Sequence, residues 1–247
     1  MHVMVTGSEG AIGKVVLRAL RERGHRTRGL DLNVEQSEAD EVLEGSITDP
    51  ALLKQAMEGM DTVIHLAAEP DDAPFVEVLL EPNVIGPFRV FEAALAAGVK
   101  RVICASSIQV NSPWDQTGEV IRVGDRPLLN NHYAMTKVWV ENMAMLYAQR
   151  RGLSTIAARI GWFPRDPENA SESNPNLPCL KNWYFSQNDC GRFFRLCVES
   201  ERPKPGQCEV FFALGRQLTT PLIDQSRSWE VIGYEPEDAF PENLTFG

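Results

Sequence analysis

Short apolar runs alternate with longer amphipathic stretches over the first 160 residues of the chain. Runs of four to eight residues rich in β-branched side chains are typical of buried strands, whereas apolar positions three and four residues apart are typical of helices. We predict strands over His2–Thr6, His25–Asp31, Asp61–Leu66, Lys100–Ala105 and Leu153–Ile160. We predict helices over Ala11–Arg23, Ala51–Glu58, Val84–Ala97 and His132–Arg151. This alternation predicts an α/β fold in which right-handed βαβ units build a doubly wound parallel sheet.

The pattern changes after residue 160. Phe163–Pro178 contains four prolines among polar residues, which predicts a loop, and its length favours a lid over a simple connector. Beyond it we expect a helix over Asn188–Ser200, a strand over Glu209–Ala213, a helix over Pro221–Ile232 and an acidic surface tail over Glu235–Gly247. We therefore divide the chain into a sheet domain, residues 1–160, and a small C-terminal cap with its tail, residues 161–247, which is not an independent domain.

The charge balance and the cysteines narrow the range of partners. The 34 acidic and 24 basic side chains leave a net charge of −10, which disfavours binding to nucleic-acid phosphates or anionic lipid. No apolar run approaches the roughly 20 residues of a membrane helix, and no signal region follows Met1. The five cysteines form no C-x-x-C pair and no Cys/His cluster. We expect a cytoplasmic protein with reduced thiols, no metal site, and no nucleic-acid or membrane partner.

Three glycines follow the first predicted strand at Gly7, Gly10 and Gly13. Glycines at this spacing allow a tight turn, let backbone N–H groups approach a pyrophosphate, and let the helix pack closely on the strand. A turn with a purely structural role could have the same three glycines. However, Asp31 ends the second predicted strand, where a carboxylate can accept hydrogen bonds from ribose hydroxyls. The combination predicts dinucleotide binding, with NAD favoured over NADP because Asp31 would repel a 2′-phosphate and Leu32 follows it.

Tyr133 and Lys137 lie four residues apart on one predicted helix, so their side chains point the same way. A nearby ammonium group favours the phenolate and lowers the pKa of a tyrosine toward the working range of a base. A solvated helix face would also account for the pair alone. This helix, however, follows a strand that ends at the hydroxyl pair Ser106-Ser107, which places both groups in a dinucleotide-binding context.

These motifs resemble the extended short-chain dehydrogenase/reductases, the NAD-dependent epimerase/dehydratase family. The resemblance covers about residues 1–160 and rests on the glycine triplet, Asp31, His65-Leu66-Ala67-Ala68, Asn83, Ser106-Ser107 and Tyr133-x-x-x-Lys137. Within that family the chain is most similar to the uronate dehydrogenases, through Pro74-Phe75, Asn83–Gly86, Ala105–Ser107, Arg159–Gly161, Trp183–Ser186 and Gly233–Pro236. The resemblance implies a Rossmann-like sheet with a small C-terminal cap that binds the substrate.

The resemblance also implies roles for individual residues. Tyr133 would remove a proton from a substrate hydroxyl, Lys137 would lower its pKa and hold the nicotinamide ribose, and Ser107 would bind the same substrate oxygen. The implied contacts of NAD are Gly7, Gly10, Ala11, Ile12, Gly13, Asp31, Ser46, Ile47, Leu66, Ala67, Ala68, Asn83, Tyr133, Lys137 and Ile160. The implied contacts of the substrate are Glu69, Ser107, Ile108, Gln109, Tyr133, Gly161, Trp162 and Lys181. His65 is better explained as a histidine packed in the core.

Three positions depart from the family pattern. Ser46 stands where an acidic contact to adenine is expected. The segment Glu69–Asp72 holds three carboxylates, which would repel an anionic sugar acid, where uronate dehydrogenases have a small polar residue. Leu177–Asn182 lacks the arginine that would bind a uronate carboxylate, so either Lys181 or Arg165 would have to replace it.

The sequence thus predicts an NAD-dependent oxidoreductase that oxidises a hydroxyl of a small free sugar or sugar acid. A sugar epimerase of the same family is an alternative, although the short cap leaves little room for a nucleotide sugar. A non-catalytic dinucleotide-binding regulator is a further alternative, against which the complete set of Ser107, Tyr133 and Lys137 argues. A dehydratase would carry Thr-Asp-Glu where this chain has Ser107-Ile108-Gln109.

We also expect a homodimer. The helices predicted over Val84–Ala97 and His132–Arg151 resemble those through which many family members pair as a four-helix bundle. Their aromatic side chains would either lie in that interface or pack on their own sheet; they are Phe88, Phe91, Trp139 and Tyr147.

Overall fold

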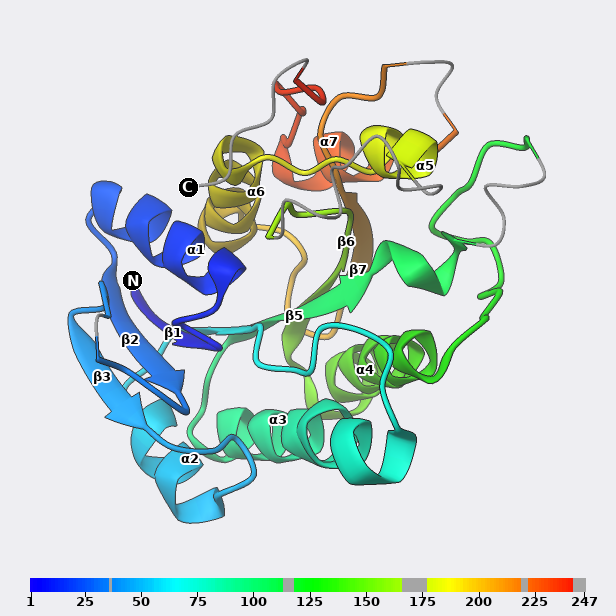
Figure 1. Ribbon diagram of the computed structural model, residues 1–247. Coiled ribbons are helices and arrows are strands. Elements are labelled where there is room, and N and C mark those ends of the chain that lie inside the picture. Colours follow the sequence, from blue (N-terminus) through cyan, green and yellow to red (C-terminus); the bar gives the residue numbers. More distant parts are fainter. Residues whose placement is uncertain (36, 113–117, 166–176, 219–221, 242–247) are drawn as a thin grey trace.

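Seven parallel strands form one sheet in the computed structural model, in the order β3-β2-β1-β4-β5-β6-β7 (Figure 1). The structure describes residues 1–35, 37–112, 118–165, 177–218 and 222–241. The strands are β1 His2–Thr6, β2 Arg26–Asp31, β3 Glu41–Glu44, β4 Thr62–His65, β5 Arg101–Ser107, β6 Ser154–Ile160 and β7 Cys208–Ala213. The helices are α1 Ala11–Glu22, α2 Pro50–Met57, α3 Gly86–Ala96, α4 His132–Arg151, α5 Leu177–Asn182, α6 Gln187–Glu199 and α7 Ser226–Ile232. The predicted Rossmann-like doubly wound fold is confirmed.

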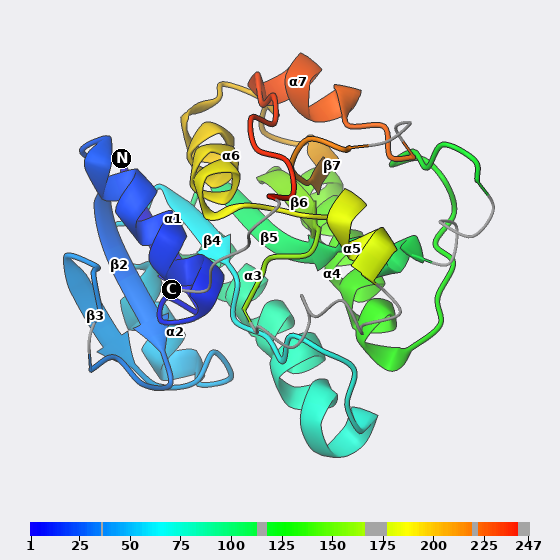
Figure 2. The same ribbon diagram turned by 45° about the horizontal axis from the view of Figure 1, so that its top comes forward.

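Two hydrophobic cores cover the two faces of the sheet. On one face, α1, α6 and α7 pack against alternate strand residues such as Val3 and Val5. On the other face, α2, α3 and α4 pack against the intervening positions, including Met4. Figure 2 shows α1 and α6 side by side on the first face. Because successive side chains of a strand point to opposite faces, the central strands are buried on both sides and read as continuous apolar runs.

The direction in which successive strands are added to the sheet reverses between β3 and β4. From β1 the chain adds β2 and β3 on one side, and then crosses to place β4 on the other side of β1. In open parallel sheets a ligand site forms outside the carboxyl ends of the strands at such a switch point. The loops after β1, β4, β5 and β6 all begin there. None of the helices in the described ranges is long and apolar enough to span a membrane.

The strand β3 and two helical turns before α3 were not predicted from the pattern. Glu41–Glu44 is a short edge strand with exposed side chains, so it lacks the apolar run of a buried strand. Two π-helical turns, η1 Phe75–Leu79 and η2 Glu81–Ile85, precede α3, so this helical region begins earlier than the predicted Val84. A proline is tolerated near the start of η2 because the first N–H groups of a helix have no partner within it.

The C-terminal part of the chain is packed on the sheet. The strand β7 pairs with β6, and α6 packs against α1. The short helix α5 was not predicted, and α7 begins at Ser226 rather than at Pro221, which lies outside the described residues along with 166–176 of the predicted loop. Residues 235–241 of the predicted tail are not free, because the buried Asp189 carboxylate accepts hydrogen bonds from the N–H groups of Glu237 and Asp238, whereas residues 242–247 lie outside the described residues.

Candidate active site

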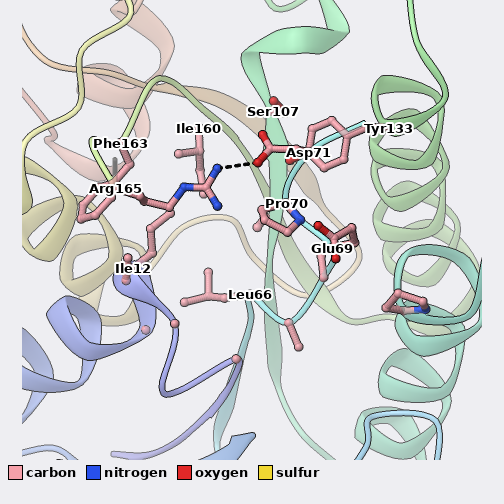
Figure 3. Close-up of a pocket in the computed structure, with 18 of the residues that line it drawn as sticks. Ile12, Leu66, Glu69, Pro70, Asp71, Ser107, Tyr133, Ile160, Phe163 and Arg165 are labelled. Atoms are coloured by element: carbon pink, nitrogen blue, oxygen red, sulfur yellow. Dashed lines mark hydrogen bonds and ion pairs between the residues drawn. The ribbon is translucent and has the colours of Figure 1, made fainter. Parts of the chain in front are cut away.

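A cleft of about 1220 Å³ opens at the carboxyl ends of the strands, and Figure 3 shows the side chains that line it. The cleft runs from the glycine-rich turn after β1 to the start of α4. Every site residue predicted from the sequence lines it except Asn83 and Lys181. Among the described residues, no group of three or more His, Cys, Asp or Glu side chains could hold a metal ion.

The turn after β1 requires glycine at two positions. Gly7 has φ +70°, and a Cβ atom there would lie 2.7 Å from the backbone nitrogen of Ala67. A Cβ atom on Gly13 would lie 2.1 Å from the carbonyl oxygen of Gly7. Gly10 precedes α1 and provides no side-chain cap for its first N–H groups. The turn therefore leaves a close backbone approach and an uncapped helix N-terminus at the cleft, which suits the phosphates of a dinucleotide.

Asp31 ends β2 at the rim of the same turn. Its carboxylate accepts hydrogen bonds from the N–H groups of Glu9 at 2.8 Å and Leu32 at 2.7 Å. These bonds fix the carboxylate at the cleft, where its remaining lone pairs can accept ribose hydroxyls. Beside it, the Ser46 hydroxyl bonds to that of Thr48 at 2.8 Å, while Ile47 is nearly buried and lines the cleft.

The other end of the cleft brings together Ser107, Tyr133 and Lys137. Ser107 ends β5, and its hydroxyl accepts the N–H of Gln109 at 3.2 Å. Tyr133 and Lys137 lie on α4, with the Lys137 ammonium 5.1 Å from the centre of the Tyr133 ring. All three side chains are buried or nearly so and line the cleft. This arrangement places a hydroxyl, a phenol and an ammonium group where one substrate oxygen could meet them.

Burial shifts the pKa values of Tyr133 and Lys137. It raises the pKa of Tyr133 to about 12, an effect to which the charges of Asp71 and Glu69 add, while hydrogen bonding with Ser107 and the Arg165 charge lower it. Burial lowers the pKa of Lys137 to about 8. The pKa of the phenol is therefore shifted upward, opposite to the downward shift expected from Lys137 alone, because the loss of solvation outweighs the hydrogen bond with Ser107 and the charge of Arg165.

Asn83 and His65 support the cleft from behind. The Asn83 side chain accepts the N–H of Glu69 at 2.8 Å and donates to its carbonyl oxygen at 2.9 Å, which fixes the start of the loop after β4. It also donates to the Thr136 hydroxyl at 3.3 Å. His65 is fully buried, bonds to the Thr6 hydroxyl at 2.8 Å, and its pKa is lowered to about 3 by burial. A neutral core histidine agrees with these contacts.

Lys181 does not line the cleft. Its ammonium lies over the ring of Phe240, 5.2 Å from the ring centre, and Phe240 in turn stacks on Trp162, which is a cleft residue. The C-terminal segment thus packs against a side chain of the cleft wall without lining the cleft itself. Sequence reasoning missed this packing because nothing in the pattern around Phe240 distinguishes a packed segment from a polar tail.

The three carboxylates after β4 have different partners. Asp72 accepts the N–H groups of His132 and Tyr133, each at 3.1 Å, and so caps α4 together with Asn131. Asp71 forms an ion pair with Arg165 at 3.0 Å. Glu69 lines the cleft beside them. The sequence pointed to carboxylates at the mouth, but neither the cap nor the ion pair was predicted.

Further residues line the cleft beside the predicted contacts of NAD and substrate. The catalytic end is also lined by Pro70, Asp71, Phe163, Arg165, Leu180 and Trp183. The glycine-rich end is also lined by Glu9, Lys14, Leu30, Leu32, Asn33 and Thr48. These residues follow predicted elements closely, so their proximity to the motifs was the available signal.

Comparisons with known proteins agree with this geometry. Residues 3–162 match the NAD dependent epimerase/dehydratase family. L-arabinose 1-dehydrogenase (NAD(P)(+)) of Haloferax volcanii is 30% identical over 96% of this chain and 96% of its own length. A uronate dehydrogenase of Pseudomonas syringae pv. tomato is 33% identical over 68% of this chain and 62% of its own length.

Solved structures share the fold. The glucuronic acid dehydrogenase of Chromohalobacter salexigens superposes with a TM-score of 0.82 at 22% identity, over 96% of this chain and 85% of that chain. A point mutant of the uronate dehydrogenase from Agrobacterium tumefaciens, complexed with NAD, superposes with a TM-score of 0.80 at 22% identity, over 96% of this chain and 84% of that chain. From the family match and the relatives that span its length, the chain belongs to the NAD dependent epimerase/dehydratase family.

Proposed function

We propose that the protein oxidises a hydroxyl group of a small free sugar or sugar acid with NAD as the hydride acceptor. The observation that carries this proposal is one continuous cleft with the glycine turn and Asp31 at one end and Ser107, Tyr133 and Lys137 at the other. The full-length relative named for L-arabinose oxidation and the relatives named for uronate oxidation support the same class of substrate.

The residues at the first end fit NAD. The glycine turn and the start of α1 would hold the pyrophosphate, and Asp31 would hold the adenosine ribose and disfavour a 2′-phosphate. Ser46 and Ile47 would border the adenine, and Leu66, Ala67, Ala68 and Ile160 would form the walls of the cofactor groove. When bound, NAD supplies the nicotinamide ring that accepts the hydride.

The residues at the second end would orient the sugar and manage its proton. Tyr133 takes the proton of the reacting hydroxyl, and Ser107 holds the same oxygen. The positive charge of Lys137 stabilises the phenolate form of Tyr133. Gly161 and Trp162 border the substrate from the C-terminal part of the chain, while Glu69, Ile108 and Gln109 border it from the sheet domain. Asn83 acts from behind by fixing the loop that starts at Glu69.

A screen for NADH formation tests this proposal. The purified protein is given NAD with free pentoses, hexoses and uronates, and absorbance of NADH is followed. Steady NADH formation with a free sugar or uronate is the expected result. Interconversion of sugars without net NADH would favour the epimerase alternative, and NAD binding without turnover of any sugar would favour a regulator.

The pH dependence of the reaction follows from the two buried groups. We expect kcat for oxidation to rise with pH through a midpoint of about 8, because the pKa of Lys137 is lowered to about 8 and that of Tyr133 is raised to about 12. Two interacting groups lose their protons in two steps that belong to the pair, so between pH 8 and pH 12 the pair has lost one of its two protons. In most of that state Lys137 is neutral and Tyr133 keeps its proton, but it exchanges with a minor form, the phenolate beside a charged Lys137, which accepts the substrate proton. Measuring kcat at saturating substrates across this range checks the expectation, and a rate that falls through the midpoint would contradict it.

We also infer that the protein forms a homodimer through α3 and α4. Phe91 and Tyr147 pack inside the second core, with ring centres 5.0 Å apart, whereas Phe88 and Trp139 are each more than 40% exposed. Ile85, Met135 and Leu146 add to this exposed apolar surface. An apolar surface of this kind on two neighbouring helices suits a second copy of the chain.

Replacing Trp139 with glutamate is expected to convert the dimer to a monomer, since the charge would be buried in the interface. The mass is measured by light scattering after gel filtration. Trp229→Glu is the matched control, because Trp229 is 60% exposed on α7, on the opposite face of the sheet, and this variant should keep the mass of the dimer. A monomer mass for the unmodified protein would overturn the inference.

The cysteines at positions 104, 190, 197 and 208 are free, which supports a reducing compartment such as the cytoplasm.

A further inference from the structure

An ion pair crosses the catalytic end of the cleft. Asp71 comes from the loop after β4 and Arg165 from the segment after β6, and their side chains meet at 3.0 Å (Figure 3). Both residues line the cleft with Ser107 and Tyr133. Arg165 is the one arginine among the described residues that line the cleft. Its guanidinium is paired with a carboxylate of the protein itself, that of Asp71.

The charges of this pair are close enough to act on the reacting group. The charges of Asp71 and Glu69 raise the pKa of Tyr133, whereas that of Arg165 lowers it. The side of the cleft that faces the phenol thus carries two carboxylates against one guanidinium. The third carboxylate of the loop, Asp72, is engaged by the N-terminus of α4.

A neutral sugar and its uronate differ in the charge that they would place next to Asp71 and Arg165. A guanidinium binds a carboxylate most strongly through two parallel hydrogen bonds, but one nitrogen of Arg165 already donates to Asp71 at 3.0 Å. A uronate would add a third carboxylate beside Asp71 and Glu69, and like charges at such distances repel. The hydroxyls of a neutral sugar can instead donate hydrogen bonds to those carboxylate oxygens.

We propose that the Asp71–Arg165 pair determines substrate class and makes the site selective for neutral sugars over their uronates. This inference rests on the proposed sugar oxidation and adds the charge of the preferred substrate to it. Asp71 neutralises Arg165 and presents acceptor oxygens to the sugar. Removal of its charge frees the guanidinium to bind a uronate.

The test compares D-galactose with D-galacturonate, which differ only in a CH₂OH or a carboxylate group, and repeats the comparison with D-glucose and D-glucuronate. We expect kcat/KM of the unmodified enzyme to favour the neutral sugar by about tenfold or more. In Asp71→Asn, which keeps the size of the side chain, this ratio should fall by about 10- to 100-fold because uronate oxidation improves. Adding Arg165→Gln to Asp71→Asn should remove the gain, as a double-mutant cycle would show.

Asp72→Asn is the matched control, since it makes the same chemical change one residue away. It weakens the cap of α4 and should change kcat/KM for both sugars by the same factor. Calorimetric binding of each sugar to the NAD complex measures selectivity independently of turnover. Lack of NADH formation with every pentose, hexose and uronate of the screen described above would overturn the proposed function. Equal or tighter binding of the uronate by the unmodified enzyme, or an unchanged ratio in Asp71→Asn, would overturn the selectivity.

Discussion

Tyr133→Phe is expected to lower kcat for sugar oxidation by about 10³-fold, while the dissociation constant of NAD stays within about twofold. The substitution removes the phenol oxygen and keeps the ring, which is only 7% exposed, so the fold should be retained. Without that oxygen, Ser107 can still orient the substrate hydroxyl but no group at this position takes its proton. The loss should therefore appear in kcat with little change in KM.

Tyr147→Phe provides the control for this variant. Tyr147 lies on the same helix and is also buried, but its hydroxyl donates to Glu92 on α3, away from the cleft. It should keep the activity of the unmodified enzyme. Initial rates of NADH formation compare the two variants, and NAD binding by fluorescence confirms that each site is intact. If Tyr133→Phe kept a tenth of the activity or more, Tyr133 could not be the base.

Glu141→Gln is expected to lower the free energy of unfolding by about 3–5 kcal/mol. Glu141 lies on α4, two helical turns beyond Tyr133, and accepts two hydrogen bonds from Arg159 on β6 at 2.8 and 2.9 Å. Ser106 on β5 donates to it at 2.5 Å, and Arg159 also donates to Asn111 at 2.6 Å. The amide would leave the guanidinium, whose residue is only 3% exposed, without its countercharge.

Urea unfolding measures this effect, with two comparisons. Glu201→Gln removes a carboxylate that is 91% exposed and pairs with Lys204, so its effect should lie within about 0.5 kcal/mol. The double variant Glu141→Leu with Arg159→Met removes both charges and should recover most of the lost stability, because the cost arises from an unpaired buried charge. A loss in Glu141→Gln no greater than that in Glu201→Gln would show that the pair does not stabilise the fold.

Elements with strong local signals were predicted accurately. The bounds of α4 agree with the prediction because Asn131 caps its first turn and Gly152, with φ +78°, ends it in the left-handed conformation. The strand β1 also has the predicted bounds. The edge strand β3 and the helix α5 are too short for a periodic pattern of apolar residues to reveal them.

The site was predicted as far as its motifs extend. The glycine turn, Asp31, Ser107, Tyr133 and Lys137 meet in one cleft as expected. The direction of the pKa shift of Tyr133 could not be predicted, since it depends on how deeply the tertiary structure buries the phenol. The Asp71–Arg165 pair joins positions 94 residues apart, and no local pattern reports such a contact.

The C-terminal segment held by Asp189 has a consequence for how the enzyme is made. Translation delivers the glycine turn first, and N-terminal structure can form while synthesis continues. Phe240, which stacks on Trp162 of the cleft, follows the cofactor-binding segments in the chain, and Asp189 holds the backbone of Glu237 and Asp238 beside it. The cofactor groove can therefore form in a nascent chain before the C-terminal segment packs behind Trp162.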